Sequence, residues 1–175
     1  MAIDALYGDI ATFKGLRDRV LVRFPDWTQA QVDEAGVLVN DGMRKLYGDY
    51  NWGFLRIPPT ISLTTAVLGV YSLPTDFASI MDDLVLASSI APDRMEFVTI
   101  EARSQMTNTT PTVTGLPLAY AVKPDAFLAA TGQRWKLQVY PYPDIAYTAS
   151  YSYRPVVAEL SGDDDHYRGG PDFGL

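Results

Sequence analysis

The residues that could do chemistry are few, and the most suggestive of them lie together near the C-terminus. His166, the only histidine of the sequence, directly follows Asp163, Asp164 and Asp165. Carboxylates beside an imidazole could bind a divalent cation, and a hydrolase triad would need this same histidine next to an activated serine. The segment 161–175 is acidic, rich in glycine and without periodicity, however. A solvated tail is therefore the simpler interpretation.

Other arrangements that serve catalysis are missing from the sequence. Asp82 and Asp83 are adjacent carboxylates, but neighbouring side chains of an extended segment point to opposite faces, so they make a poor acid–base pair. No Gly-Lys-Ser or Gly-Lys-Thr phosphate loop occurs, and 0 cysteines exclude disulfides, thiolate zinc ligands and thiol catalysis. We predict that the protein is not an enzyme and uses no cofactor and no metal ion.

A run of tyrosines offers a different chemistry, the stacking of rings on a ligand. Tyr147, Tyr151 and Tyr153 share one face of a predicted strand, where they could bind a sugar ring or a base. The 14 Lys and Arg against 21 Asp and Glu give a net charge of -7, which disfavours tight binding to phosphates. A core or a protein–protein contact is the simpler use of these rings. A carbohydrate-binding module stays open as an alternative of a different class.

Two helices are predicted to precede the strands. Apolar residues recur at helical spacing over residues 10–24, which predicts the first helix. Thr28 and Gln31 have the spacing of a capping box at the start of the second helix, and Trp27 is placed to pack on Val32. Because only a few residues join the helices, we expect them to pack as an antiparallel pair.

The second helix should bury one apolar stripe. Gly36 and Gly42 within it cost helix stability, and we expect them to be tolerated because another backbone lies close. The predicted stripe follows spacings of three and four residues, through Val32, Ala35, Val39, Met43, Leu46 and Tyr50.

After Tyr50 the pattern changes to the alternation of β-strands. Pro58 and Pro59 have no N–H to donate to a ladder, so they mark a strand start or an edge, and Leu-Pro-Thr-Asp-Phe at 73–77 predicts a turn. A short helix followed by an exposed loop is expected over 102–115. The expected strands cover 55–65, 69–74, 83–89, 94–101, 118–123, 134–141 and 146–155, with turns at 90–94, 124–133 and 142–144.

These elements predict an α+β fold, in which an N-terminal antiparallel helix pair packs on an antiparallel strand-rich lobe, with an extended C-terminal tail. The expected regions are a helical hairpin over 1–54, a β-rich lobe over 55–160 and an acidic, glycine-rich tail over 161–175, which together form one compact unit. The 175 residues, 47% hydrophobic and 12% aromatic, are enough for a folded core.

Several short motifs follow one another in a recognisable order. An aromatic patch closes the helices, and a Leu-Pro-x-Asp-Phe turn, a Pro-x-x-Tyr strand and a Pro-x-Pro-x-x-x-Tyr strand pair come after it. The positions are Trp52 and Phe54; Leu73, Pro74, Asp76 and Phe77; Pro117 and Tyr120; and Pro141, Pro143 and Tyr147. From about Leu16 to Leu160 the chain resembles the head-to-tail adaptor (connector) proteins of tailed bacteriophages, those of short-tailed phages in particular.

The resemblance implies a structural virion protein in the neck between capsid and tail, assembled in the host cytoplasm. It implies a ring of twelve copies that docks on the portal protein, extends the DNA channel and offers a platform for the tail nozzle. Double-stranded DNA would pass through without tight binding, and no membrane is involved. A head-completion or stopper neck protein of a long-tailed phage is the alternative in the same class. The candidate partner-interface residues are Trp52, Phe54, Asp76, Phe77, Tyr147, Tyr151, Tyr153, Tyr167, Phe173 and Leu175.

Overall fold

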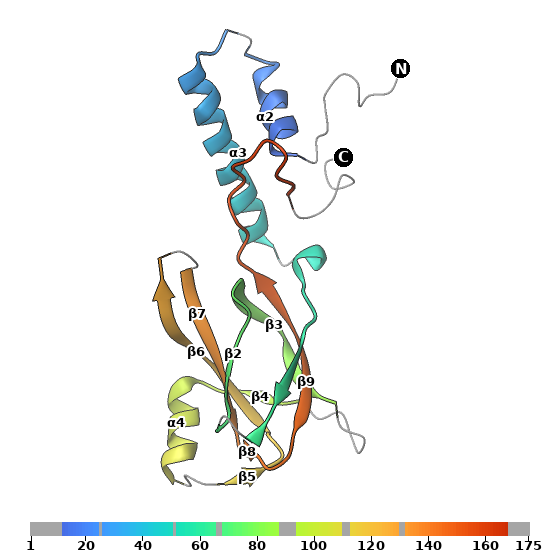
Figure 1. The fold of residues 1–175 in the computed structure, drawn as a ribbon, viewed down its shortest axis with the longest axis vertical. Helices are drawn as coiled ribbons and strands as arrows, with labels where there is room; N and C mark the ends of the chain where they lie inside the picture. The colour runs from blue at the N-terminus through green and yellow to red at the C-terminus, as the bar shows by residue number, and fades with distance from the viewer. Residues whose placement is uncertain are drawn as a thin grey trace. The chain divides into compact units, whose positions relative to one another are not determined.

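The chain separates into two compact units, which are described one at a time. The computed structural model describes residues 12–24, 26–50, 52–65, 68–87, 94–109, 113–129 and 132–167. The first unit comprises the residues up to Leu55 together with those from Val157 onward, and the second runs from Arg56 to Val156. Helices dominate the first unit and strands the second, so the predicted α+β class is confirmed (Figure 1).

The first unit is built on the helices α2 (Phe13–Leu21) and α3 (Gln29–Asp49). The predicted capping box of α3 is confirmed, because the Thr28 N–H donates a hydrogen bond of 2.8 Å to Gln31 Oε1. α2 ends before the predicted Phe24, whose ring stacks on Trp27 with centroids 4.6 Å apart. The two helices pack against each other as the expected antiparallel pair.

The buried side of α3 follows the predicted stripe as far as Met43, with Val32, Val39 and Met43 half-buried, and departs from it in the last turns. Ala35 is fully buried as expected, but Leu46 and Tyr50 are exposed and Tyr47 is buried in their place. A step of one residue turns the side chain by about 100°, so only the C-terminal end of the expected stripe was displaced around the helix. A Cβ on Gly36 would lie 3.1 Å from Phe13 Cζ, so the close neighbour is a side chain and not the predicted backbone.

A short 3-10 helix, η1 (Gly53–Leu55), ends the first part of this unit. The chain re-enters the unit at Val157, and the residues from there to Tyr167 run along the helices (Figure 1). These residues belonged to the predicted β-rich lobe and tail. Their return to the helices depends on contacts across most of the sequence, which local patterns do not contain.

The described residues of the second unit form three sheets. Their strand orders are β1–β9–β3, β2–β7–β6–β4 and β5–β8. Most pairs are antiparallel as predicted, but β4 pairs with β6, and β5 with β8, in parallel. The elements are β1 (Thr60–Leu63), β2 (Val70–Ser72), β3 (Phe77–Leu86), β4 (Glu96–Phe97), α4 (Ile100–Thr109), β5 (Thr114–Gly115), β6 (Ala119–Leu128), β7 (Gly132–Tyr140), β8 (Tyr142–Pro143) and β9 (Tyr147–Pro155).

Three expectations about these strands were wrong in their limits. β3 begins at Phe77 and not at residue 83, and register shifts in its pairing with β9 hide its alternation. The predicted strand 94–101 shrinks to β4, because α4 already begins at Ile100. Most of the predicted turn at 124–133 is strand, since a bulge after Pro124 lets the β6–β7 ladder continue. The turn expected at 90–94 lies, apart from its last residue, outside the described residues.

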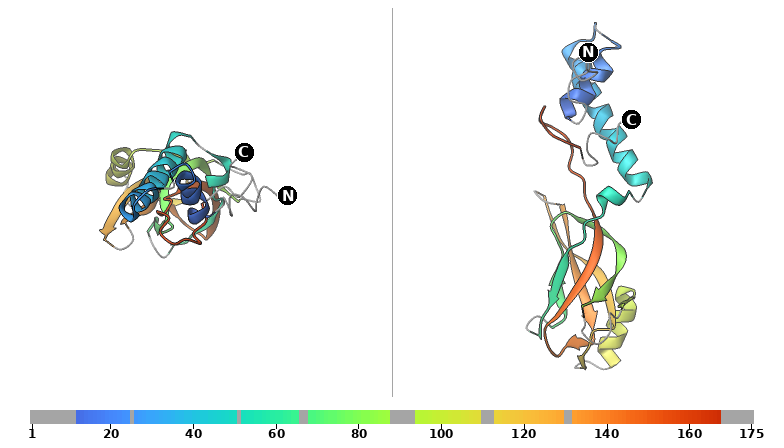
Figure 2. Two further views of the ribbon diagram at one scale, coloured as in Figure 1. Left: turned by 90° about the horizontal axis from the view of Figure 1, so that it is seen from above. Right: turned by 90° about the vertical axis from the view of Figure 1, so that its right-hand side faces the viewer.

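The core of the second unit includes the predicted alternation of β9. Ala149, Tyr151 and Tyr153 are buried, and Thr148 and Ser150 on the other face are exposed as predicted, whereas Ser152 on that face is buried. α4 lies against β6 and β7 (Figure 2). Side chains from the other strands and loops complete the same cluster, namely Leu63, Tyr71, Leu73, Phe77, Leu84, Leu86, Met95, Tyr120, Leu137 and Val139.

Candidate functional site

The aromatic patch predicted at the end of α3 exists as a cluster of rings. Trp52 stacks on Phe54 at 5.8 Å and meets Tyr50 edge-on at 4.9 Å, and Phe54 meets Tyr47 at 6.1 Å. The Trp52 Nε1–H donates to the Leu46 carbonyl at 2.7 Å, a group that the last turn of a helix leaves without an intrahelical partner. The cluster therefore ends α3 while Tyr50 stays exposed and Trp52 and Phe54 half-buried.

Residues 157–167, which we call the C-terminal strap, are held on α3 by polar contacts. Asn40 Nδ2 donates to the Leu160 carbonyl, and the Leu160 N–H donates back to Asn40 Oδ1, both at 2.9 Å. One turn further along α3, Arg44 forms an ion pair of 2.5 Å with Glu159 and another of 2.6 Å with Asp41. Asn40 contacts only the backbone N–H and C=O of Leu160, so these hydrogen bonds do not depend on the leucine side chain.

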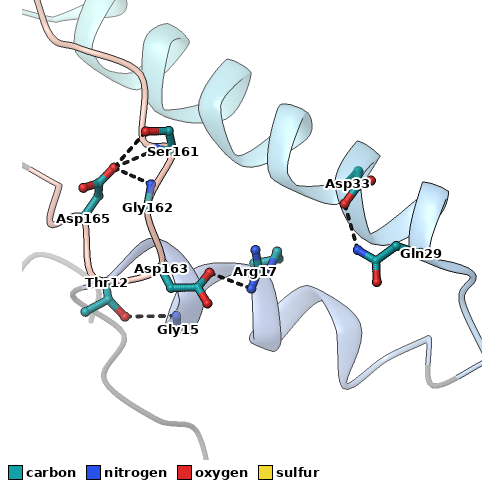
Figure 3. A network of polar contacts seen from close by, with 9 residues as sticks. All are labelled: Thr12, Gly15, Arg17, Gln29, Asp33, Ser161, Gly162, Asp163 and Asp165. Carbon is teal, nitrogen blue, oxygen red and sulfur yellow. Dashed lines mark hydrogen bonds and ion pairs between the residues drawn. The ribbon is translucent and has the colours of Figure 1, made fainter.

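The strap also closes the first turn of α2 (Figure 3). The Phe13 and Lys14 N–H groups donate to the carbonyls of Asp165 and Asp163 at 2.8 and 3.2 Å. The Gly15 N–H donates to Thr12 Oγ1 at 3.1 Å. Backbone N–H groups at a helix start have no partner within the helix, so strap and N-cap together satisfy three of them.

Charges reinforce this arrangement. Arg17 on α2 pairs with Asp163 at 2.9 Å, and the Ser161 and Gly162 N–H groups both donate to Asp165 Oδ2 at 2.7 Å (Figure 3). The Ser161 N–H, followed by the Gly162 N–H, lowers the pKa of the Asp165 carboxyl, and the nearby His166 acts in the same direction. The carboxylate thus stabilises a tight turn within the strap.

The acidic run was expected to be a solvated tail. The side chains of Asp163, Asp164 and His166 are exposed as expected, but the backbone of the run is hydrogen-bonded to α2. His166 forms a backbone bridge with Thr12, and Asp163 and Asp165 contact α2 or the strap itself as described above. Among the described residues, no three His, Cys, Asp or Glu side chains are grouped as ligands of a metal ion. Sequence reasoning missed this docking because its partners lie at the opposite end of the chain.

The predicted interface residues in the second unit divide into core and surface. Phe77, Tyr151 and Tyr153 are each at most 5% exposed. Tyr153 donates to Asp76 Oδ1 at 2.8 Å. Burial, and then the charge of Asp76, raises the pKa of Tyr151 to about 12. Tyr147 is half-buried. A buried tyrosine face offers no platform for stacking a sugar ring.

The remaining predicted interface residues are Tyr147 on β9 and three residues near the C-terminus. Tyr147 donates to Asp144 Oδ1 at 2.7 Å, and this hydrogen bond lowers the pKa of Asp144 and raises that of Tyr147. Tyr167 is half-buried at the end of the strap, whereas Phe173 and Leu175 lie outside the described residues.

The sequence model of the SU10 adaptor proteins matches residues 11–173, nearly the whole chain. The chain belongs to the SU10 adaptor protein family. It is accordingly a phage head-tail adaptor, a structural component of the virion, as the order of the motifs predicted. No curated protein matches the chain.

The adaptor exposes two pairs of large apolar side chains that sequence reasoning did not select. Val37 and Leu38 face outward on α3, and Phe127 and Leu128 end β6. The first pair had a signal, because three consecutive apolar residues at 37–39 cannot all lie within one stripe. The second was hidden by the expectation of a turn. No helix among the described residues is long and apolar enough to cross a membrane.

Proposed function

We propose that this adaptor is a ring subunit of the virion neck that docks on the portal, extends the DNA channel and carries the tail nozzle. The observation that carries the proposal is the family match over residues 11–173. An adaptor placed between head and tail must bind a component on each side. A ring of twelve copies, as in the short-tailed phage proteins that the motifs resemble, would do so around the path of the DNA.

The surface of the second unit and of the helices supports assembly. A subunit that closes into a ring needs two different surfaces, one for each neighbour. The exposed apolar pairs of α3 and β6 lie on different units and suit protein contacts, since the centres of interfaces are enriched in large apolar residues. Trp52 and Phe54 are half-buried and keep surface for a partner, so they stay our interface candidates.

The charge balance supports the passage of DNA. The net charge of -7 repels the phosphate backbone, whereas each Lys or Arg that binds a phosphate would slow the DNA in a salt-dependent way. We propose that DNA moves through the ring without a tight binding site.

Electron microscopy of the purified protein with and without portal-bearing heads tests the proposal. We expect rings of twelve copies that sit on the portal, and heads lacking the portal serve as the control that should stay bare. A protein that stays monomeric and ignores both portal and tail would contradict it. Co-purification of a long-tailed phage's tail-terminator components, in place of a nozzle, would instead favour the stopper protein.

A further inference from the structure

The outward face of α3 carries an unusual stripe, which we call the α3 stripe. Its residues follow the spacing i, i+3, i+4 and i+7, so they share one side of the helix: Glu34, Val37, Leu38 and Asp41. Val37 and Leu38 are 59% and 58% exposed. Two large apolar side chains in the middle of a solvent-facing stripe, with a carboxylate at each end, are typical of a contact surface.

The hairpin of β6 and β7 ends in a second apolar pair, which we call the hairpin tip. Phe127 and Leu128 are 73% and 48% exposed. Phe127 lies opposite Gln133 in the ladder, on the face of Trp135, so it continues a core-facing row beyond the end of the core. Phe127 thus leaves a large ring exposed at the described end of the hairpin.

The two surfaces differ in charge. Residues 119–140 hold three cations and one carboxylate, and the carboxylate of Asp125 pairs with Lys136 at 2.8 Å. Lys123 and Arg134 are left without an ion pair among the described residues. Residues 29–49 hold four carboxylates and two cations, and Glu34 has no ion pair among the described residues. Arg134 near the hairpin tip and Glu34 on the α3 stripe are therefore opposite charges, each without an ion pair among the described residues.

We infer that the hairpin tip of one copy packs on the α3 stripe of the next copy. The inference rests on the proposed ring. Phe127 and Leu128 point to opposite faces of the hairpin, so the tip would pack end-on over Val37 and Leu38. Arg134, which shares the face of Leu128, would approach Glu34. A contact of like with like would instead bring two acidic stripes or two basic tips together, so charge favours the unlike pairing. An unlike contact repeated around an axis closes a ring.

Cysteine cross-linking tests the contact directly, because the chain has 0 cysteines of its own. Leu38→Cys and Phe127→Cys are prepared as separate chains, assembled alone or as a mixture on portal-bearing heads, and treated with an oxidant or a short bismaleimide. We expect a covalent dimer only in the mixture. A chain with both substitutions should give a ladder of covalent oligomers. Leu118→Cys, at a leucine of the second unit that is 55% exposed, replaces Phe127→Cys in the control and should not cross-link to Leu38→Cys.

Charge reversal gives an independent readout. Arg134→Glu or Glu34→Lys alone should lower the fraction of protein in rings by about tenfold, and the two together should restore most of it. Arg23→Glu, an exposed cation at the end of α2, changes the net charge equally and should leave the rings intact.

The outcomes separate this inference from the proposed function. If rings form but give no Leu38–Phe127 cross-link, the inferred contact is wrong and the proposed ring is unaffected. Dimers from a single variant show a like-with-like contact, and a double variant that closes only on itself shows a contact within one chain, so either result overturns the inferred contact too. Wild-type protein that forms no ring, even on portal-bearing heads, contradicts the proposed function itself.

Discussion

Asn40 on α3 and Leu160 in the C-terminal strap exchange two hydrogen bonds, each of 2.9 Å, across 120 residues of sequence. The amide side chain offers a donor and an acceptor in one plane, which matches the N–H and C=O of a single extended residue. The pair therefore recognises the strap as a strand would, without a sheet. It fixes the position at which the chain returns to the helices.

Asn40→Ala should loosen the strap without unfolding the second unit. Removing two hydrogen bonds costs about 1–3 kcal/mol, since each net contribution is about 0.5–1.5 kcal/mol. We expect faster hydrogen–deuterium exchange over residues 157–167 and unchanged exchange in β6 and β7. Asn108→Ala, at an exposed position of α4 where the side chain makes no hydrogen bond to a described residue, is the matched control. Unchanged exchange of the strap in Asn40→Ala would show that Asn40 does not hold it.

The strap should open in acid because of Asp165. Its pKa is lowered from the usual 3.8 by the Ser161 and Gly162 N–H groups, so the charged form is favoured in the docked strap. The contribution to the turn that shapes the docked strap is present above that usual value and is lost as the pH falls through the lowered pKa. Amide exchange of residues 157–167, followed as the pH is lowered, measures this.

A matched pair of variants isolates this carboxyl from the other acids. Asp165→Asn should leave the strap loose at neutral pH and remove that part of the acid transition. Asp164→Asn, one residue away and without a hydrogen bond to a described residue, should titrate like the wild type. An acid transition of the same size in both variants would assign the effect to other groups.

Local chemistry explains what could be predicted from the sequence. The capping box at Thr28, the prolines before β1 and the alternation of β9 are each set by neighbours a few residues apart. These features form in the same way whatever the tertiary structure of the rest of the chain. The order of the motifs along the chain indicated the adaptor family, which no single motif could indicate alone.

Tertiary contacts explain what could not be predicted. The strap docks on α2 through backbone carbonyls. Because every residue carries a carbonyl, the amino-acid types of the strap do not indicate this docking. The bulge after Pro124 and the register shifts of β3 break the period that a strand is recognised by. The interface candidates were chosen by residue type, and type alone does not tell the buried Tyr151 from the exposed Phe127.

Gly69 should tolerate alanine much less well than Gly132 does. Both have positive φ, 68° and 76°, where an L side chain is strained by about 1–2 kcal/mol. A Cβ on Gly69 would also lie 2.8 Å from Tyr142 Cδ1 and 3.0 Å from the Val139 carbonyl, whereas no described residue crowds Gly132 within 4 Å. Urea unfolding of the second unit should show a loss of about 2–4 kcal/mol for Gly69→Ala and about 1 kcal/mol for Gly132→Ala. Equal losses would mean that Tyr142 moves aside at no cost.

Alkaline pH should destabilise the second unit through two buried tyrosines. Burial, and then the charge of Asp83, raises the pKa of Tyr120 to about 12, and burial with Asp76 does the same for Tyr151. A tyrosine whose pKa is raised on folding contributes stability that is complete below its usual value of 10.0 and is lost as the pH rises toward 12. Over that window each tyrosine should shift the unfolding equilibrium toward the unfolded state by up to about tenfold per pH unit. Urea midpoints at increasing pH should fall less steeply in Tyr120→Phe and Tyr151→Phe, and Tyr167→Phe, in the other unit, should follow the wild type. A parallel fall in all four proteins would place the alkaline transition in other groups.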